Sequence, residues 1–162
     1  MSDDLRRDFR DTIGQLVTGV TIVTSRGPDG PAGLTTNAVT SLSLDPLLVL
    51  VCFAEGSRTL PVVRATRRFA VNVLAAGQDD LAAVFASRRV AREKFEAVTH
   101  TEDHGVPVLD GALAWLACDL VAEHPGGDHT IGVGAVTAMD FDPDAEPLVF
   151  HRGGYTTLPR GS

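Results

Sequence analysis

The sequence predicts one mainly β domain over residues 1–162, an antiparallel barrel, closed or split, with flanking helices. About six or seven strand-like runs follow one another at short spacing, and tight turns rich in Gly, Pro and Asp separate the early ones. Helical periodicity is confined to the start of the chain and its middle. Strands joined by short turns favour antiparallel pairing, because a parallel crossover needs about a dozen residues or more.

The first elements are a helix and a strand. Apolar residues recur at helical spacing near the start (Leu5, Phe9, Ile13, Leu16 and Val17), which predicts an amphipathic helix that Gly19 ends. The β-branched run 19–25 predicts a strand, and the Gly- and Pro-rich composition of residues 26–31 predicts a turn. The stretch that follows is therefore the return arm of a hairpin.

This return arm, residues 33–43, is uncharged and holds five hydroxyls and one amide. Ser41 and Ser43 alternate with two leucines, so we expect one face to reach a core and the other to offer small neutral donors and acceptors. Such a face suits a flat, uncharged ligand rich in heteroatoms. A Thr/Ser-rich strand with its polar face in water fits the same pattern.

The turn at Asp45-Pro46 leads into the remaining elements. The expected strands are 47–53, 69–74, 112–123, 129–139 and 147–152. Ser57 is placed to cap a short helix that accepts Pro61 in its first turn, and residues 79–86 repeat apolar side chains on one helical face. A basic run at 88–95 and a polar loop that reaches Pro107 follow this second helix.

The composition is that of an ordinary globular protein, with 44% hydrophobic and 22% charged residues. No apolar run approaches the roughly 20 residues that cross a bilayer, so no membrane association is expected. The charged N-terminus is not followed by the apolar segment of a signal peptide. Cys52 and Cys118 lie in strand-like apolar runs, as small core residues do in a reducing compartment. We therefore expect a cytoplasmic protein.

The charge distribution indicates a small anionic ligand rather than nucleic acid. A net charge of −7 argues against general nucleic-acid binding. The segment from Arg58 to Lys94 nevertheless holds eight of the fourteen basic residues and three acidic ones, a local balance of +5. Such a basic band fits a phosphorylated small molecule, although solvated helix faces would give the same count.

Several familiar sites are missing from the sequence. It contains neither the G-x-G-x-x-G of a dinucleotide-binding turn nor the G-x-x-x-x-G-K-[ST] of a P-loop. His100 and His104 have a spacing that binds zinc on a helix, but their setting is polar and turn-like. The two cysteines are far apart in the sequence. We therefore expect no metal site.

Two short motifs are candidate binding sites. Ser57-Arg58-Thr59, at the start of a predicted helix, offers hydroxyls, backbone N–H groups and a guanidinium to a phosphate. The same residues also fit a helix N-cap with a solvated arginine. Gly126-Gly127-Asp128-His129 places a histidine just past a glycine turn, where it either projects into a cleft or lies on the surface.

Taken in order, these stretches resemble the flavin reductase domain of two-component monooxygenase systems, the short reductases that supply reduced flavin to a separate oxygenase. The resemblance runs from about Phe9 to about Tyr155, and it rests on the order and spacing of several short motifs. The motifs are 18–24, 33–38, 41–43, Asp45-Pro46, Val51-Cys52, Ser57-x-Thr59, 69–74, Lys94-Phe95, 105–109, Ala117-Cys118, 127–129 and Gly132-x-Gly134-x-Val136.

The resemblance implies a split β-barrel that forms a homodimer, with FMN or FAD near the subunit interface and NADH or NADPH as co-substrate. It assigns Thr35, Thr36, Asn37 and Ser41 to the isoalloxazine ring, with Cys52 beside that pocket. It assigns Ser57 and Thr59 to the phosphate, and Lys94 and Phe95 to the flank of the ring or the ribityl chain. His129 matches the catalytic-site histidine near the nicotinamide, with Asp128 beside it and Tyr155 in the approaching C-terminal segment.

One residue departs from the family pattern. Glu55 precedes the phosphate motif, where relatives often have uncharged polar residues. A carboxylate there would weaken phosphate binding unless it points away.

The leading functional hypothesis is an NAD(P)H:flavin oxidoreductase that releases reduced FMN or FAD to a partner monooxygenase. Under this hypothesis His129 positions the nicotinamide and is not an obligatory proton donor. Two alternatives remain open: a flavoprotein that keeps its flavin and oxidises a small organic substrate, and a flavin-binding protein without turnover that stores or senses flavin.

Overall fold

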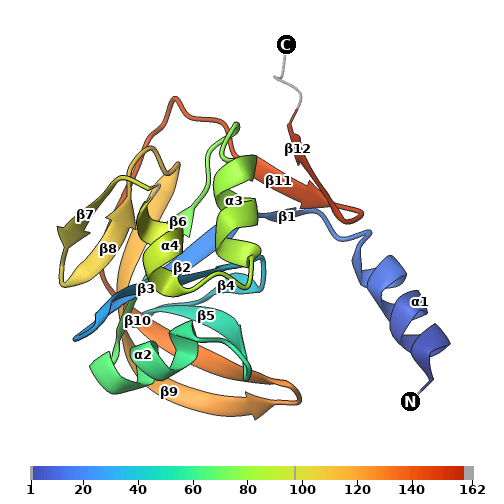
Figure 1. Ribbon diagram of the computed structural model, residues 1–162, viewed down its shortest axis with the longest axis horizontal. Helices are drawn as coiled ribbons and strands as arrows, with labels where there is room; N and C mark the ends of the chain where they lie inside the picture. The colour runs from blue at the N-terminus through green and yellow to red at the C-terminus, as the bar shows by residue number, and fades with distance from the viewer. Residues whose placement is uncertain (1, 97, 159–162) are drawn as a thin grey trace.

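The computed structural model describes residues 2–96 and 98–158, which form a mainly β fold with helices on its outside (Figure 1). The main sheet has seven strands in the order β3-β2-β6-β9-β10-β5-β4. Their bounds are β2 Thr21–Gly27, β3 Gly30–Thr36, β4 Val39–Leu44, β5 Leu47–Ala54, β6 Arg68–Val73, β9 Ala114–Gly126 and β10 His129–Phe141. A smaller sheet has the order β1-β11-β12, with bounds Thr18–Gly19, Leu148–His151 and Gly154–Thr157.

The connection between β3 and β4 shows that the main sheet is curled into a split barrel. These strands are consecutive in the chain, yet they occupy opposite edges of the sheet. Only Asn37 and Ala38 join them, so the two edges come close together and the sheet must curl on itself. No ladder pairs β3 with β4 in the described residues, which leaves the barrel split. The predicted fold class is confirmed.

Most of the predicted strands are confirmed. β2 and β3 form the predicted hairpin, in which Gly27 pairs with Gly30. β5, β6, β9 and β10 fall on their predicted runs, all with antiparallel partners. The predicted return arm 33–43 is divided, however, because its two halves pair with different neighbours, β2 and β5. The predicted last strand, 147–152, is β11, whereas β12 was not predicted.

Two apolar clusters fill the fold. The first joins the barrel strands to α2 (Thr59–Thr66) around Phe53 and Phe69, whose ring centroids lie 6.0 Å apart at 87°. The second lies against α3 (Asp79–Ala86) and α4 (Ala91–Glu96) around Phe85 and Phe95, 5.0 Å apart at 86°. α3 has the predicted bounds, and the basic run before Phe95 is partly helical because it contains α4. The two clusters pack the outer helices α2, α3 and α4 against the strands.

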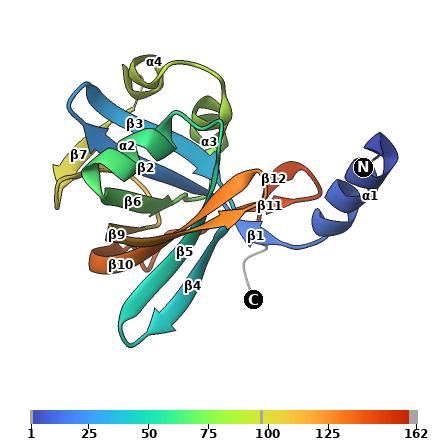
Figure 2. The ribbon, with the colours of Figure 1, turned by 90° about the horizontal axis from the view of Figure 1, so that it is seen from below.

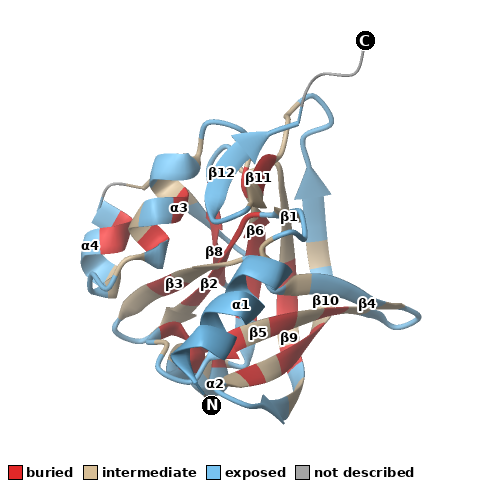
Figure 3. Cartoon of the chain, turned by 90° about the vertical axis from the view of Figure 1, so that its right-hand side faces the viewer, coloured by how far each residue is buried: buried red, intermediate tan, exposed pale blue. Residues whose placement is uncertain are grey.

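The first helix, α1 (Asp3–Ile13), stands away from the rest of the molecule (Figure 2). It ends at Gly14, so the predicted end at Gly19 was wrong: bonds from Gln15 N–H to Thr12 O and from Leu16 N–H to Ile13 O tighten the last turn and close the helix. No residue of α1 is buried, and Figure 3 shows it exposed along its length. Its apolar side chains, including Phe9 at 67% exposure, have no cover within the described chain.

The predicted polar loop that reaches Pro107 is instead largely a hairpin of β7 (His100–Asp103) and β8 (Val106–Leu109). His104 and Gly105 have φ of 48° and 75°, the left-handed backbone of a two-residue hairpin turn. The prediction failed because β8 is short and contains Pro107, a residue that strands usually lack. All four residues of β8 are buried.

The leucines of β4 are exposed, so the prediction that this strand turns one face to a core was wrong for the single chain. Leu42 is 47% exposed and Leu44 83%. Ser41 pairs with Val49 and Ser43 with Leu48, so a bulge at Leu42 breaks the expected alternation. β4 is also an edge strand, and an edge has a neighbour on one side only.

Gly134 is expected to be a stability-determining residue. A Cβ at this position would lie 2.5 Å from Phe69 Cζ and 3.0 Å from Cys118 Cβ, both on buried residues. Gly134→Ala should therefore lower the free energy of unfolding by at least about 1 kcal/mol, measured by urea titration. Gly154→Ala is the matched control, because its Cβ meets only His151 O at 3.9 Å. Equal stability of the two variants would contradict the packing argument.

Candidate functional site

The Ser57-Arg58-Thr59 motif lies at the N-terminus of α2 and borders a cavity. Ser57 Oγ accepts hydrogen bonds from the N–H groups of Thr59 (3.1 Å) and Leu60 (3.4 Å), which confirms the predicted cap. Thr59 is 2% exposed, and its hydroxyl has no hydrogen-bond partner in the described chain. A helix N-terminus that presents a free hydroxyl to a cavity is suited to binding an anion.

The cavity has a volume of about 470 Å³, and its described lining contains four cations and no carboxylate. Arg58 comes from the entry to α2, Arg88 and Arg89 from the α3–α4 connection, and Lys94 from α4. Gly33 and Thr35 of β3 form part of the wall between them. This lining fits a phosphate group, because charged donors form the strongest hydrogen bonds to phosphate oxygens.

The remaining cations of the basic band are paired on the surface. Arg64 Nε lies 2.8 Å from Glu123 Oε2, Arg68 Nε lies 3.2 Å from Asp119 Oδ1, and Arg92 Nε lies 3.1 Å from Glu96 Oε1. Arg67 Nη1 also lies 3.5 Å from Glu123 Oε1. The eight basic residues thus divide equally between a solvated, ion-paired surface and the cavity.

Lys94 lies in the cavity wall and fastens α4 to its neighbours. Its Nζ donates to Phe85 O (2.8 Å) and to Gly33 O (3.4 Å), and the residue is 8% exposed. Burial lowers the pKa of Lys94, and the charge of Arg58 lowers it further. Gly33 is required here, because a Cβ would lie 2.6 Å from Phe85 Cε1. Phe95, the other residue of this motif, packs on Phe85 in the core and lines none of the cavities described here.

The polar end of β3 lies between this cavity and a smaller one. Thr35 lines both; Thr36, Asn37 and Tyr155 line the smaller one, which has a volume of about 160 Å³. Thr35 Oγ1 donates to Ala82 O (2.7 Å), and Asn37 Nδ2 donates to Thr18 Oγ1 (3.1 Å). The structure therefore brings these predicted ring-binding residues beside the cation-lined cavity.

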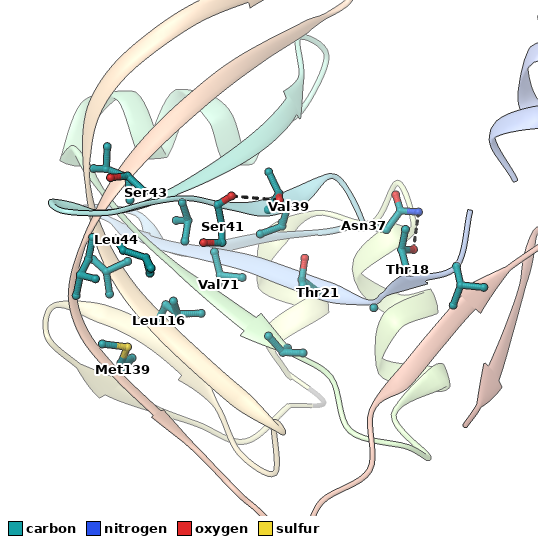
Figure 4. Close-up of a pocket in the computed structure, with 18 residues that line it drawn as sticks. Thr18, Thr21, Asn37, Val39, Ser41, Ser43, Leu44, Val71, Leu116 and Met139 are labelled. Atoms are coloured by element: carbon teal, nitrogen blue, oxygen red, sulfur yellow. Dashed lines mark hydrogen bonds between the residues drawn. The ribbon is translucent and has the colours of Figure 1, made fainter. Parts of the chain in front are cut away.

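Ser41 on β4 and Cys52 on β5 do not line the cation-lined cavity. Ser41 lines a mainly apolar cavity of about 570 Å³ that extends from Thr18 and Asn37 at one end to Leu44 and Met139 at the other (Figure 4). Cys52 is half-buried on β5, where its N–H donates to Ala38 O (2.9 Å). Asn37 thus links the ring-binding candidates on β3 to this apolar cavity.

His129 lies at the start of β10, next to the turn from β9. Its Nδ1 is 2.7 Å from Asp128 Oδ1, and this hydrogen bond lowers the pKa of Asp128. Asp128 O accepts from Glu55 N–H (3.0 Å), which ties the turn to the segment before Ser57. The β9–β10 turn and β12 lie at opposite ends of the molecule in Figures 1 and 3, so a single chain does not bring His129 and Tyr155 together.

Glu55 points away from the cavity. Ala54 and Gly56 line the cavity, whereas Glu55 hydrogen-bonds Thr130 Oγ1 and lies 3.9 Å from Arg64 Nη2. The one departure from the family pattern therefore does not place a carboxylate against the phosphate site.

No group of three or more His, Cys, Asp or Glu side chains in residues 2–96 and 98–158 is arranged to hold a metal ion. His100 and His104 lie at either end of β7, near Glu102 and Asp103 respectively. Within the same residues, no helix has the length and apolar character that crossing a membrane requires.

The fold and site define a split-barrel protein with a cation-lined cavity beside a polar, uncharged strand end. The chain belongs to the family described as the flavin reductase like domain, whose model matches residues 13–159.

Similar proteins carry related names. The chain is 38% identical over 155 residues to the flavin-dependent monooxygenase, reductase subunit HsaB, of Mycobacterium tuberculosis, covering 94% of this chain and 82% of that protein. It is 41% identical over 154 residues to the FMN reductase (NADH) SmoA of Agrobacterium fabrum, covering 95% and 87%. The solved structure of the Streptomyces globisporus C-1027 NADH:FAD oxidoreductase SgcE6 superposes with a TM-score of 0.93 at 35% identity, covering 100% and 98%.

Arg88 and Arg89 line the site but were not predicted as members of it. They stand out in the sequence as a basic run, but about thirty residues separate them from Arg58. Only the packing of the α3–α4 connection over β3 brings them to the same cavity.

Proposed function

We propose that this chain is an NAD(P)H-dependent flavin reductase that supplies reduced FMN or FAD to a separate monooxygenase. The observation that carries the proposal is the cation-lined cavity at the α2 N-terminus, which adjoins the neutral polar end of β3 through Thr35. A flavin has the same two parts: a phosphate that suits the first region and an uncharged heteroaromatic ring that suits the second. Family membership and the names of the relatives support this reading.

The proposed roles follow from the contacts. When bound, a flavin would supply the hydride acceptor and a reduced nicotinamide the hydride, so the task of this chain would be to bind and align the two molecules. Ser57 and Thr59 would hold the phosphate, with Lys94 and Phe95 fixing the wall beside it. Thr35, Thr36 and Asn37 would offer neutral donors to the ring edge, and Thr18 fixes the orientation of the Asn37 amide.

The active protein in this proposal is a homodimer. α1 exposes a whole apolar side, and β4 exposes Leu44 next to the mainly apolar cavity of about 570 Å³. A second copy of the chain offers the same two surfaces, so a two-fold contact would cover both at once. The dimer would also allow His129 of one chain to approach the flavin of the other, which explains why one chain leaves it far from β12.

We expect the flavin-bound protein to sediment at twice the 17.1 kDa mass of the chain. Leu44→Glu should shift it toward the monomer, because it places a charge in the proposed apolar contact. Val121→Glu is the control, an exposed apolar residue that does not line the cavity beside β4. A wild-type protein that binds flavin as a 17.1 kDa species would contradict the dimer.

A steady-state assay with free flavin and NADH or NADPH as the two varied substrates tests the proposed function. A reductase turns over many equivalents of free flavin for each chain. A flavoprotein oxidase would retain one flavin and need an organic substrate, and a storage protein would bind flavin without consuming the nicotinamide. Either of these last two results would replace the proposed function with its rival.

A further inference from the structure

The cavity holds more unpaired cations than a single phosphate needs. A phosphate at the α2 N-terminus already has the Ser57 and Thr59 hydroxyls and the Arg58 guanidinium as donors. Lys94 Nζ donates to two carbonyl groups close by. Arg88 and Arg89 lie on the α3–α4 connection, a different wall of the same cavity.

The side chains of Arg88 and Arg89 also have no partner in residues 2–96 and 98–158. The four arginines of the basic band that lie outside the cavity are all ion-paired: Arg64 and Arg67 with Glu123, Arg68 with Asp119, and Arg92 with Glu96. Two adjacent, unpaired guanidinium groups that line a cavity without a carboxylate are arranged for a second anionic group.

We propose that Arg88 and Arg89 bind the second phosphate of FAD, and that this chain therefore prefers FAD to FMN. The inference rests on the proposed function, since it assumes that the first phosphate belongs to a flavin. A diphosphate places two phosphates side by side on one ligand, so one phosphate can bind at Ser57 and Thr59 while the other binds at the arginines of the same cavity. Both arginines are exposed, so the adenosine of FAD would lie at the solvent-facing mouth of the cavity.

The 2′-phosphate of NADPH has the same chemistry, but the structure favours the flavin. Arg88 and Arg89 share their cavity with Ser57 and Thr59, the residues proposed to hold the flavin phosphate. His129 and Tyr155, the residues proposed for the nicotinamide, do not line this cavity. The subsite is therefore continuous with the flavin site.

Isothermal titration calorimetry with FMN, FAD and riboflavin tests the proposal on three proteins: wild type, R88Q/R89Q and R92Q. Wild type should bind FAD more tightly than FMN. R88Q/R89Q should lose about tenfold in FAD affinity while FMN affinity changes by less than about threefold, and the FAD loss should shrink at high salt because the arginines are exposed. R92Q is the matched control: Arg92 lies on α4, pairs with Glu96 and does not line the cavity.

Each alternative outcome is distinct. Equal FAD and FMN affinities in wild type, or equal losses of both in R88Q/R89Q, would overturn the second-phosphate subsite but leave the reductase proposal intact. If R88Q/R89Q keeps its FAD affinity in the titration but loses NADPH-dependent flavin reduction in a parallel steady-state assay, the arginines belong to the nicotinamide site and the FAD assignment is overturned. Failure of the wild type to bind any flavin would overturn the proposed function itself.

Discussion

Replacing both Ser57 and Thr59 with alanine should weaken FMN binding by a hundredfold or more, while riboflavin affinity changes little. Riboflavin lacks the phosphate that these hydroxyls are proposed to hold, so their removal should leave its affinity nearly unchanged. Each hydrogen bond to a charged group contributes about 1.5–3 kcal/mol, or about ten- to a hundredfold in affinity. The expected loss is large because Thr59 lines the cavity and its hydroxyl makes no other hydrogen bond in the described chain.

Single substitutions separate phosphate binding from helix capping. Thr59→Val keeps the volume and removes only the hydroxyl, so it should lower FMN affinity without disturbing α2. Ser57→Ala also removes the cap that Ser57 Oγ provides to Thr59 and Leu60, and should cost about 1 kcal/mol of stability as well. If FMN and riboflavin weaken equally in the double variant, the pair caps the helix and does not bind phosphate.

Elements defined by local pattern were predictable from the sequence. The β2–β3 hairpin follows from Gly27, Gly30 and the residues between them, and α3 follows from apolar residues at helical spacing. The cap by Ser57 was predictable for the same reason, because it involves residues only two and three positions away. In each case the contacts that determine the element lie within a few residues of sequence.

Features that depend on distant contacts were not predictable. The sequence of 33–43 does not reveal that its halves lie at opposite edges of the sheet, since this depends on which strands β9 and β10 join. The bulge between Ser41 and Ser43 leaves no local signal either. The orientation of Glu55 depends on Thr130 and Arg64, which come from other elements.

The β9–β10 turn combines a feature that the local sequence predicts with one that depends on a distant contact. Gly127 has φ of 74°, as its position in a glycine turn suggests, and it directs the chain so that His129 follows on β10. The bond from Glu55 N–H to Asp128 O, which links this turn to the segment before the phosphate motif, joins residues far apart in sequence. This link fixes the turn that carries His129 to the segment before Ser57.

His129→Ala should therefore impair the use of NADH much more than flavin binding. If His129 positions the nicotinamide, KM for NADH should rise and kcat should fall, a combined loss of about 1–3 kcal/mol in transition-state stabilisation. Flavin affinity should stay nearly constant, because His129 does not line the cation-lined cavity. Flavin titration beside NADH-dependent reduction, on wild type and variant, measures both quantities.

Asp128→Asn should raise KM for NADH and lower kcat as well, but by less than His129→Ala does. The carboxylate holds the imidazole at 2.7 Å, and the amide can keep a hydrogen bond but not the charge. Unchanged NADH kinetics in His129→Ala would remove the residue from the nicotinamide site, and a large loss of flavin affinity would move it to the flavin pocket. A fall in kcat/KM in His129→Ala that Asp128→Asn reproduces in part, with flavin affinity intact in both, is the result that the geometry of this turn predicts.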